Sequence, residues 1–236
     1  MLLLKLCKRR GFSVHESILS KPLNFISLFW TGSLLADQEH LDAELVKHAL
    51  VPVTEYLRIL GGSRDVLHHG SVPVAGVVRV LDYLRAMANV IVLDVPCTYD
   101  DFQFEMLGCA NHVILVGEQS ITSVRTLKLI FDALSKGVSS ASYHVVLNRY
   151  NPAVAGLGVR DIERVLRVSR IHTIPDDRLA VLTAANEGKL LRQIDPHSPV
   201  LTAIDALVDS LLKDTATVKP AASRSLMSRL FHSFTK

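Results

Sequence analysis

The chain has 236 residues, of which 49% are hydrophobic and 21% are charged. This composition excludes a chain that is disordered throughout, and the length suffices for a stable core without disulfides or a structural metal. A formal net charge of +3 is too small to predict nucleic-acid binding. The three cysteines are far apart and form no Cys-x-x-Cys pair, which favours a reducing compartment over a zinc site.

The first 33 residues match neither a recognisable targeting signal nor the strand–helix rhythm of the rest of the chain. Within them, the run LNFISLFW at 23–30 is typical of a buried strand. Residues 214–223 are small and polar and include a proline, which favours a linker. We therefore expect an atypical N-terminal segment (1–33), an α/β domain (34–213), the linker (214–223) and a short tail (224–236).

Four short apolar runs within the expected domain predict strands. They are rich in valine and isoleucine and do not alternate strictly with polar residues, which is typical of strands buried on both faces. A fifth run is weaker and ends at two glycines. The four strong runs are Asn89–Pro96, His112–Gly117, Tyr143–Asn148 and Ile171–Pro175, and the weaker one is Tyr56–Leu60.

Segments with helical spacing of their apolar residues lie between and after these runs. They are Val74–Met87, Thr122–Leu134, Arg160–Arg167, Arg178–Glu187 and Pro199–Leu212. Strands that alternate with helices of this length predict an α/β fold, with a mostly parallel, doubly wound sheet and helices on both faces. We expect Asn89–Pro96 and His112–Gly117 to be neighbouring inner strands.

A carboxylate ends the first strong strand, VIVLDVP, at Asp94. In α/β sheets, ligands bind beyond the carboxyl ends of the strands. A carboxylate there can hold a Mg²⁺-bound water beside a nucleotide phosphate, the role known as Walker B. The alternative interpretation is an aspartate that caps the following turn.

The strand in VVLNRY also ends in polar residues, Asn148 and Arg149. The amide of Asn148 can pair with the edge of a purine, and the guanidinium of Arg149 can stack on its face. The alternative is an asparagine that forms a turn. The segment TIPDD, with a helix that ends in Asn-Glu-Gly, is ordinary α/β sequence when taken alone.

In this order and spacing, the segments resemble the MinD/ParA class of P-loop ATPases, in particular its CpaE/TadZ branch of pilus assembly. The resemblance covers about 33–213. The central piece is the most specific, because it follows the pattern of strand, Asp-x-Pro, Asp-Asp turn, helix, strand and Ser-x-Arg helix start. The pieces are LADQEHLDAELVKHAL, VIVLDVPCTYDDFQFEMLGCANHVILVGEQSITSVRTLKLI, VVLNRY, DIERVL and TIPDDRLAVLTAANEGKLL.

The resemblance implies ATP and Mg²⁺ as cofactors and assigns roles to particular residues. By it, Asp94 is the Walker B acid and contacts Mg²⁺ indirectly, while Asp100 and Asp101 lie in the region that senses the γ-phosphate. These three acids are the catalytic candidates. The positions that resemble purine contacts are Asn148, Arg149 and Pro175.

One defining element of the class is missing from these 236 residues. The class carries a glycine-rich loop with a Lys-Ser/Thr pair, whose backbone N–H groups and lysine hold the phosphates. The sequence contains no such segment, and its one glycine pair, Gly61-Gly62, continues with Ser63 and Arg64. We expect either the run at 23–30 to take the place of the missing central strand or a gap to remain there.

The tail RSLMSRLFHSFTK places its apolar side chains within an arc of about 140° of a helix. From Lys219 onward the chain has four Lys/Arg and no Asp or Glu. This composition is typical of an interfacial helix on an anionic membrane. The alternative is a helix packed on its own domain or on a partner. The apolar residues are Leu226, Met227, Leu230, Phe231 and Phe234.

These observations favour a degenerate or truncated MinD/ParA-type domain that acts in pilus assembly or protein localisation without turning over ATP by itself. The alternatives are an active MinD-like ATPase whose phosphate loop is missing from this sequence, and a receiver-like α/β interaction module. We expect protein partners of such a machinery, a homodimer and an anionic membrane surface, and no nucleic acid. The expected location is the cytoplasm, peripheral on the inner face of the cell membrane.

Overall fold

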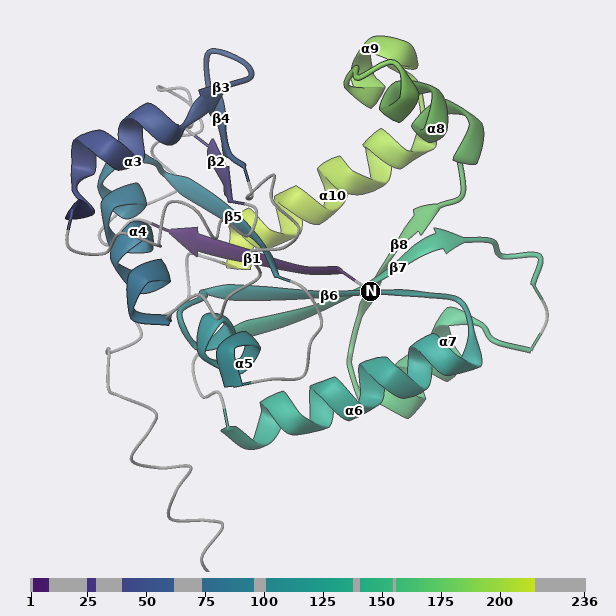
Figure 1. Ribbon diagram of the computed structural model, residues 1–236. Helices are drawn as coiled ribbons and strands as arrows, with labels where there is room; N and C mark the ends of the chain where they lie inside the picture. The colour runs from purple at the N-terminus through teal and green to yellow at the C-terminus, as the bar shows by residue number, and fades with distance from the viewer. Residues whose placement is uncertain are drawn as a thin grey trace, which may run out of the picture. The chain divides into compact units, whose positions relative to one another are not determined.

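The computed structural model of the chain describes residues 2–8, 25–28, 40–61, 74–95, 101–137, 141–154 and 156–214 (Figure 1). The chain divides into two compact units. The N-terminal unit holds Leu3–Val113 with two short later pieces, and the C-terminal unit holds Ile114–Lys136 and Tyr143–Thr215 with the first two residues. Each unit is an α/β arrangement of its own strands and helices.

The sheet of the N-terminal unit has the strand order β3-β4-β2-β5-β1. The middle of this order is parallel, because β2 (Phe25–Leu28) pairs in parallel with both β4 (Leu57–Leu60) and β5 (Val90–Val95). The outer strands run antiparallel to their neighbours: β1 (Leu2–Lys8) to β5, and β3 (Val51–Pro52) to β4. Every residue of β5 has a register partner in β1, from Val90 opposite Lys8 to Val95 opposite Leu3.

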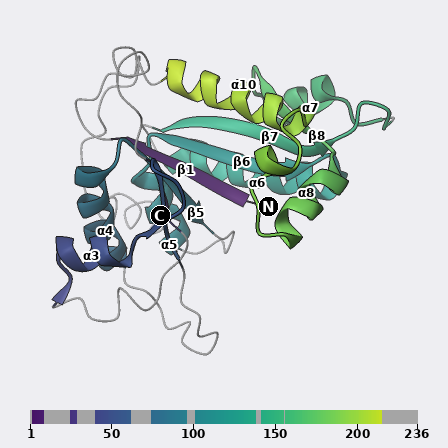
Figure 2. The same ribbon diagram turned by 90° about the horizontal axis from the view of Figure 1, so that it is seen from above.

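The described residues of this unit form three helices: α3 (Ala43–Ala49), α4 (Val74–Met87) and α5 (Asp101–Gly108). The helix α3 begins where the Asp42 carboxylate accepts a hydrogen bond from the Leu45 backbone N–H at 2.7 Å, as an N-cap residue does. The carbonyl of Leu41 accepts hydrogen bonds from Arg79 and Tyr83 of α4. These bonds hold α3 against α4, and the two helices lie side by side in Figures 1 and 2.

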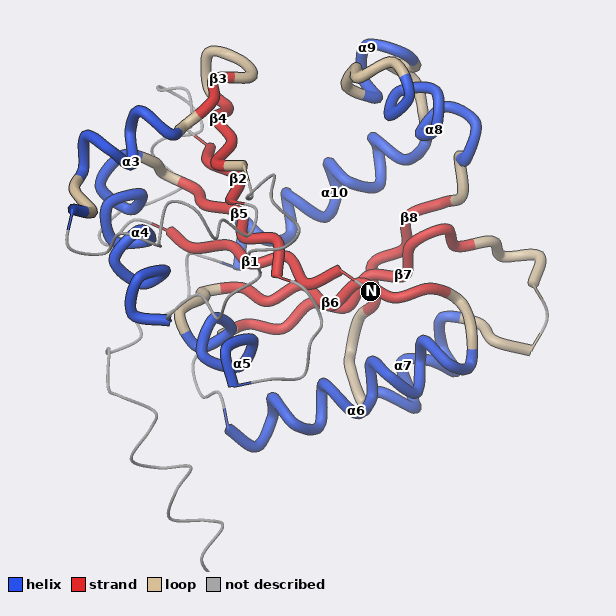
Figure 3. The backbone as a smooth tube through the Cα atoms, in the orientation of Figure 1, coloured by secondary structure: helices blue, strands red, loops and turns tan. Residues whose placement is uncertain are grey.

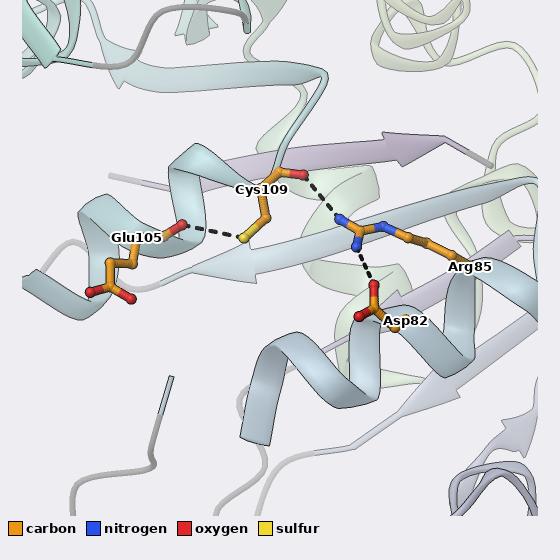
Figure 4. A network of polar contacts seen from close by, with 4 residues as sticks. All are labelled: Asp82, Arg85, Glu105 and Cys109. Atoms are coloured by element: carbon orange, nitrogen blue, oxygen red, sulfur yellow. Dashed lines mark hydrogen bonds and ion pairs between the residues drawn. The ribbon is translucent and has the colours of Figure 1, made fainter. Parts of the chain in front are cut away.

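The arginine Arg85 fastens α4 to the end of α5 (Figure 4). Its guanidinium donates to the Cys109 carbonyl at 3.2 Å and pairs with the Asp82 carboxylate at 2.6 Å. The Cys109 thiol donates in turn to the Glu105 carbonyl within α5. Because a helix C-terminus leaves carbonyls without helical partners, a donor from a neighbouring helix satisfies a group that burial would otherwise penalise.

The C-terminal unit follows a strand–helix alternation. Its strands are β6 (His112–Glu118), β7 (Ser142–Tyr150) and β8 (Ile171–Pro175), in that spatial order, and β7 and β8 are parallel. The helices α6 and α7 lie on one side of these strands and α10 on the other (Figures 1 and 3). The helices are α6 (Ile121–Gly137), α7 (Val159–Leu166), α8 (Arg178–Asn186), α9 (Leu191–Ile194) and α10 (Pro199–Asp214).

Helical periodicity explains why these helices pack where they do. In α6, the buried residues Val124, Leu127, Ile130 and Leu134 recur every three to four positions and form one face. In α10, the buried residues Val200, Leu207 and Leu211 are seven and four positions apart, which also places them on one face. The strands are apolar on both faces, as in β6, where Val113, Ile114 and Leu115 are all buried.

The predicted α/β fold, mostly parallel with helices on both faces, is confirmed. The strand expected at 23–30 is present as β2, but one expectation about the sheet is wrong and one strand was missed. The strand of Asp94 does not neighbour His112–Gly117, because its two edges are taken by β2 and β1. Residues 2–8 also form a strand that was not predicted, so β5 has no open edge.

Removing the Arg85 side chain should destabilise the chain more than removing its ionic partner. Arg85→Ala takes a donor from the part-buried Cys109 carbonyl, which costs about 1–2 kcal/mol of unfolding free energy. Asp82→Ala breaks an ion pair whose carboxylate is 64% exposed, which costs about 0.5 kcal/mol or less. Chemical denaturation of both variants measures the difference. Equal losses would contradict the structural role of Arg85.

Candidate functional site

The carboxyl ends of β6, β7 and β8 meet at one edge of the C-terminal unit. The ion pair between Glu118, the last residue of β6, and Arg149 near the end of β7 joins Oε1 and Nη1 at 3.3 Å. Since β7 and β8 are parallel and Tyr150 lies opposite Pro175, the end of β8 lies at the same edge. This is the edge at which α/β sheets bind their ligands.

The backbone at the end of β7 contains a bulge. Three residues of β7 advance against two of β8, because Leu147 is opposite Thr173 and Tyr150 is opposite Pro175. Arg149 has φ = 53°, in the left-handed region that side chains other than glycine rarely adopt. The Asn148 side-chain oxygen accepts a hydrogen bond from the Arg149 N–H at 3.0 Å. The bulge therefore re-aims the two side chains that sequence analysis assigned to a purine.

The residue after Glu118 holds the loop that follows the bulge. The Gln119 side-chain oxygen accepts from the Asn151 N–H at 3.1 Å, and its nitrogen donates to the Leu157 carbonyl at 2.9 Å. Gln119 thus bridges both ends of the loop between β7 and α7. Within the loop, Asn151 Oδ1 accepts from the Ala153 N–H. One side chain of the β6–α6 turn therefore holds the backbone on the far side of Arg149.

The β6–α6 turn itself is tightly built. The Ser123 hydroxyl accepts a hydrogen bond from the Glu118 N–H at 2.8 Å, and the Ser120 hydroxyl accepts from the Ser123 N–H at 3.2 Å. Gly117 precedes this turn, and a Cβ there would lie 2.5 Å from Leu127 and 2.7 Å from the Ser123 hydroxyl. The close approach of α6 explains why glycine stands at this position.

The end of β8 passes into α8 through Pro175, Asp176 and Asp177. The Asp177 carboxylate accepts a hydrogen bond from the hydroxyl of Ser198 at 2.6 Å, which ties the start of α8 to the start of α10. Ser198 is buried, so this charge-assisted bond satisfies a polar group inside the unit. The proline predicted to contact a purine therefore sits on a backbone that is anchored on both sides.

The acids predicted to serve Mg²⁺ belong to the N-terminal unit. Asp94 is the fifth residue of β5, half-buried, and burial raises the pKa of its carboxyl above the ordinary value. Asp101 is the first residue of α5, and Asp100 lies outside the described residues. The structure thus groups Asn148, Arg149 and Pro175 within one unit and holds Asp94 in the other.

The residues at the β6–β8 edge fit a purine better than they fit phosphates or a metal. An amide, a guanidinium and a proline ring offer a hydrogen-bonding edge and flat surfaces. Arg149, however, is paired with Glu118, and two more acids follow Pro175. Within the described residues, no three His, Cys, Asp or Glu side chains gather as a metal site.

Solved structures of ATPases share this arrangement of strands and helices. A ParA family ATPase from Chlorobium tepidum matches with a TM-score of 0.69 and 14% identity over 79% of this chain and 85% of its own. MinD from Pyrococcus horikoshii, solved with Mg-ADP, matches at 0.63 and 18% over 80% and 83%. A MinC:MinD complex from Aquifex aeolicus matches at 0.62 and 16% over 86% and 88%. The chain has the MinD/ParA fold.

Comparison by sequence finds a relative that matches a smaller part of the chain. An uncharacterized ATP-binding protein of Methanocaldococcus jannaschii is 28% identical over 135 residues, which are 57% of this chain. The chain spans half the length of that curated relative. No protein-family model matches the sequence. The MinD/ParA fold is therefore established by structure, and the activity of the chain is a matter for proposal.

Two residues of this edge were missed by the sequence analysis, Glu118 and Gln119. Both directly follow the apolar run of β6, just as Asn148 follows that of β7, so the rule that singled out Asn148 applies to them equally. The predicted tail residues, Leu226 to Phe234, lie outside the described residues. Among the helices that the structure does describe, none combines the length and hydrophobicity that a membrane crossing requires.

Replacing the Asp94 carboxyl should stabilise the chain at neutral pH. Because burial raises the folded-state pKa, the charged form opposes folding: the contribution of Asp94 to stability is greatest at low pH and is lost as the pH rises through the raised pKa. Asp94→Asn removes this loss, so its melting temperature should exceed that of the wild type at pH 7. The difference should vanish below the ordinary aspartate pKa of about 3.9.

Thermal denaturation from pH 3 to pH 8 measures this effect, with Asp209→Asn on the exposed side of α10 as the control. A wild type that is more stable than Asp94→Asn at pH 7 would show that the carboxylate has a favourable partner in the folded chain.

Proposed function

We propose that the chain is a degenerate MinD/ParA-type domain of the CpaE/TadZ kind, which acts in pilus assembly or protein localisation without turning over ATP by itself. The observation that carries the proposal is a separation of functions. The residues predicted to contact a purine, Asn148, Arg149 and Pro175, lie at one edge of the C-terminal unit, whereas the 236 residues contain no glycine-rich segment with a Lys-Ser/Thr pair.

The physics of phosphoryl transfer supports this proposal. Proteins catalyse it almost entirely by positioning the phosphates and stabilising their charge. At the β6–β8 edge, the guanidinium of Arg149 is already paired with Glu118, and Asp176 and Asp177 add negative charge. A carboxylate such as Asp94 can position Mg²⁺ but cannot by itself hold a triphosphate. We therefore expect weak nucleotide binding through the base.

A second candidate is an active ATPase that receives its phosphate loop from residues beyond this sequence or from another chain. The specific observation in its favour is the half-buried carboxyl of Asp94 at the end of β5, the Walker B position of the resemblance. The relative from Methanocaldococcus jannaschii, an ATP-binding protein by name, also supports it. ATP turnover separates the two candidates.

The purified chain should release no phosphate from MgATP above the rate of an Asp94→Ala variant. The physical reason is that no lysine and no loop of backbone N–H groups neutralises the triphosphate. A phosphate-release assay on both proteins measures the rates. ATP turnover in the wild type that Asp94→Ala abolishes would contradict the proposal of a degenerate domain and establish the second candidate.

The tail is the part of the proposal that concerns location and partners. Its apolar residues and the four Lys/Arg from Lys219 onward favour reversible binding to an anionic surface on the cytoplasmic side. Partial burial of five apolar side chains yields roughly 5–8 kcal/mol, from which the cost of ordering the segment is subtracted. Each basic residue near the surface adds about 1 kcal/mol. The partners we propose are proteins of a pilus or localisation machinery and a second copy of the chain.

Phe231→Glu should release the chain from anionic vesicles, because it places a charge within the apolar arc. Phe231→Leu, which keeps the arc apolar, should bind like the wild type. Sedimentation with vesicles at low and high salt measures binding, which should weaken as salt rises. If a chain that ends at Asp214 sediments as well as the full chain, the tail is not an anchor.

A further inference from the structure

We propose that Glu118 and Gln119, the two residues at the end of β6, position the base-contacting residues of β7. The inference rests on the proposed function, because it assumes that Asn148 and Arg149 face a purine. The observation behind it is that these two successive residues contact both parts of the bulge. Glu118 pairs with the Arg149 side chain, and Gln119 accepts a hydrogen bond from the backbone of Asn151 beyond it.

The first contact is the ion pair between Glu118 and Arg149. Glu118 Oε1 lies 3.3 Å from Arg149 Nη1, and the two side chains are 58% and 61% exposed. An ion pair as exposed to solvent as this one contributes little to stability. The pair does restrict the rotamers of the long Arg149 side chain. The conformational entropy of that side chain is then already lost before a base stacks on the guanidinium. The pair is therefore better suited to pre-organising a binding residue than to holding the fold together.

The second contact is with the backbone. Gln119 accepts from the Asn151 N–H and donates to the Leu157 carbonyl, so it uses both ends of its amide on one loop. Arg149, two residues before Asn151, is in the strained left-handed conformation. Such strain persists where the surroundings over-determine the backbone. Gln119 on one side and the Asn148–Arg149 hydrogen bond on the other supply that constraint.

Helix α6 holds the end of β6, from which Glu118 and Gln119 make these contacts. The Glu118 N–H donates to Ser123 of α6, and Gly117 allows α6 to approach closely. The order of constraint therefore runs from α6 to the end of β6, and from there to the end of β7. A base that contacts Asn148 and Arg149 would meet side chains whose positions are set from the neighbouring strand.

The variants Gln119→Ala and Glu118→Gln test the two contacts, and the unit supplies matched controls. Gln193→Ala removes a similar side-chain-to-backbone bond, from Gln193 to the Leu190 N–H at 3.0 Å. Asp161→Asn removes a similar exposed carboxylate–arginine pair, with Arg164 at 3.3 Å. Both controls perturb stability in the same way without touching the β6–β8 edge.

Two readouts on the full chain are needed, both by NMR. The first is hydrogen exchange of the Asn151 amide, which should accelerate about three- to tenfold in Gln119→Ala and stay unchanged in Gln193→Ala. The second is the affinity for adenosine, which should fall about threefold or more in Gln119→Ala and in Glu118→Gln but not in the controls. A loss of stability alone would lower the affinity of the controls as well.

Salt supplies an independent check on Glu118. Because adenosine is uncharged, a difference in salt dependence between the wild type and Glu118→Gln reports on the charge of Glu118. The wild-type affinity should fall about two- to threefold more between low and high salt than that of Glu118→Gln. Should Gln119→Ala fail to fold, Gln119→Glu keeps the acceptor for Asn151 and loses the donor to Leu157, and its affinity for adenosine should also fall.

The outcomes separate the inference from the function on which it rests. Unchanged exchange and an unchanged affinity for adenosine in Gln119→Ala would overturn the positioning role and leave the base site intact. Faster exchange in Gln119→Ala, with no adenosine bound even by the wild type, would overturn the base site of the proposed function instead. Faster exchange together with a lower affinity for adenosine, absent from both controls, would support the inference.

Discussion

The left-handed backbone at Arg149 is the constraint on which the candidate site depends. A residue other than glycine at φ = 53° is unfavourable unless its neighbours hold it. Here the Glu118 carboxylate, the side-chain amides of Asn148 and Gln119, and the parallel pairing to β8 all do so. Through that constraint, residues from three different strand ends act on one short stretch of backbone. The chemistry of the edge follows from it, because the guanidinium is pre-paired and the asparagine is fixed beside it.

The same pairing bears on which part of a nucleotide the proposed site would contact. A guanidinium that is paired with Glu118 keeps its flat face but offers less net charge to a phosphate than an unpaired one. The base and the phosphates of a nucleotide make separate demands, and the residues proposed for the base all lie in the C-terminal unit. The MinD/ParA fold by itself does not imply an ATPase, because function resides in the site rather than in the fold.

Much of the fold was predictable from local patterns. The helix at Val74–Met87 and the strand at Ile171–Pro175 were predicted with their observed bounds, because their apolar spacing and end residues are local signals. The strand at 2–8 was missed, since its pairing with β5 joins residues more than eighty positions apart. That non-local pairing is also why the neighbours of β5 were assigned wrongly.

The candidate site shows the same division. Asn148, Arg149 and Pro175 could be named because polar residues at strand ends are visible in a sequence. The ion pair to Glu118 and the bridge from Gln119 could not, because each requires the register between two strands. The positive φ of Arg149 leaves no trace in the sequence either, since glycine or asparagine is the usual mark of that conformation.

The most direct test of this account compares the affinities of adenosine and MgATP for the full chain, by titration followed with NMR. If the chain recognises the base and lacks groups that hold phosphates, the two dissociation constants should agree within about threefold. An intact phosphate loop would add charge-assisted hydrogen bonds to every phosphate and favour MgATP by several orders of magnitude. MgATP binding about a hundredfold tighter than adenosine would contradict the account.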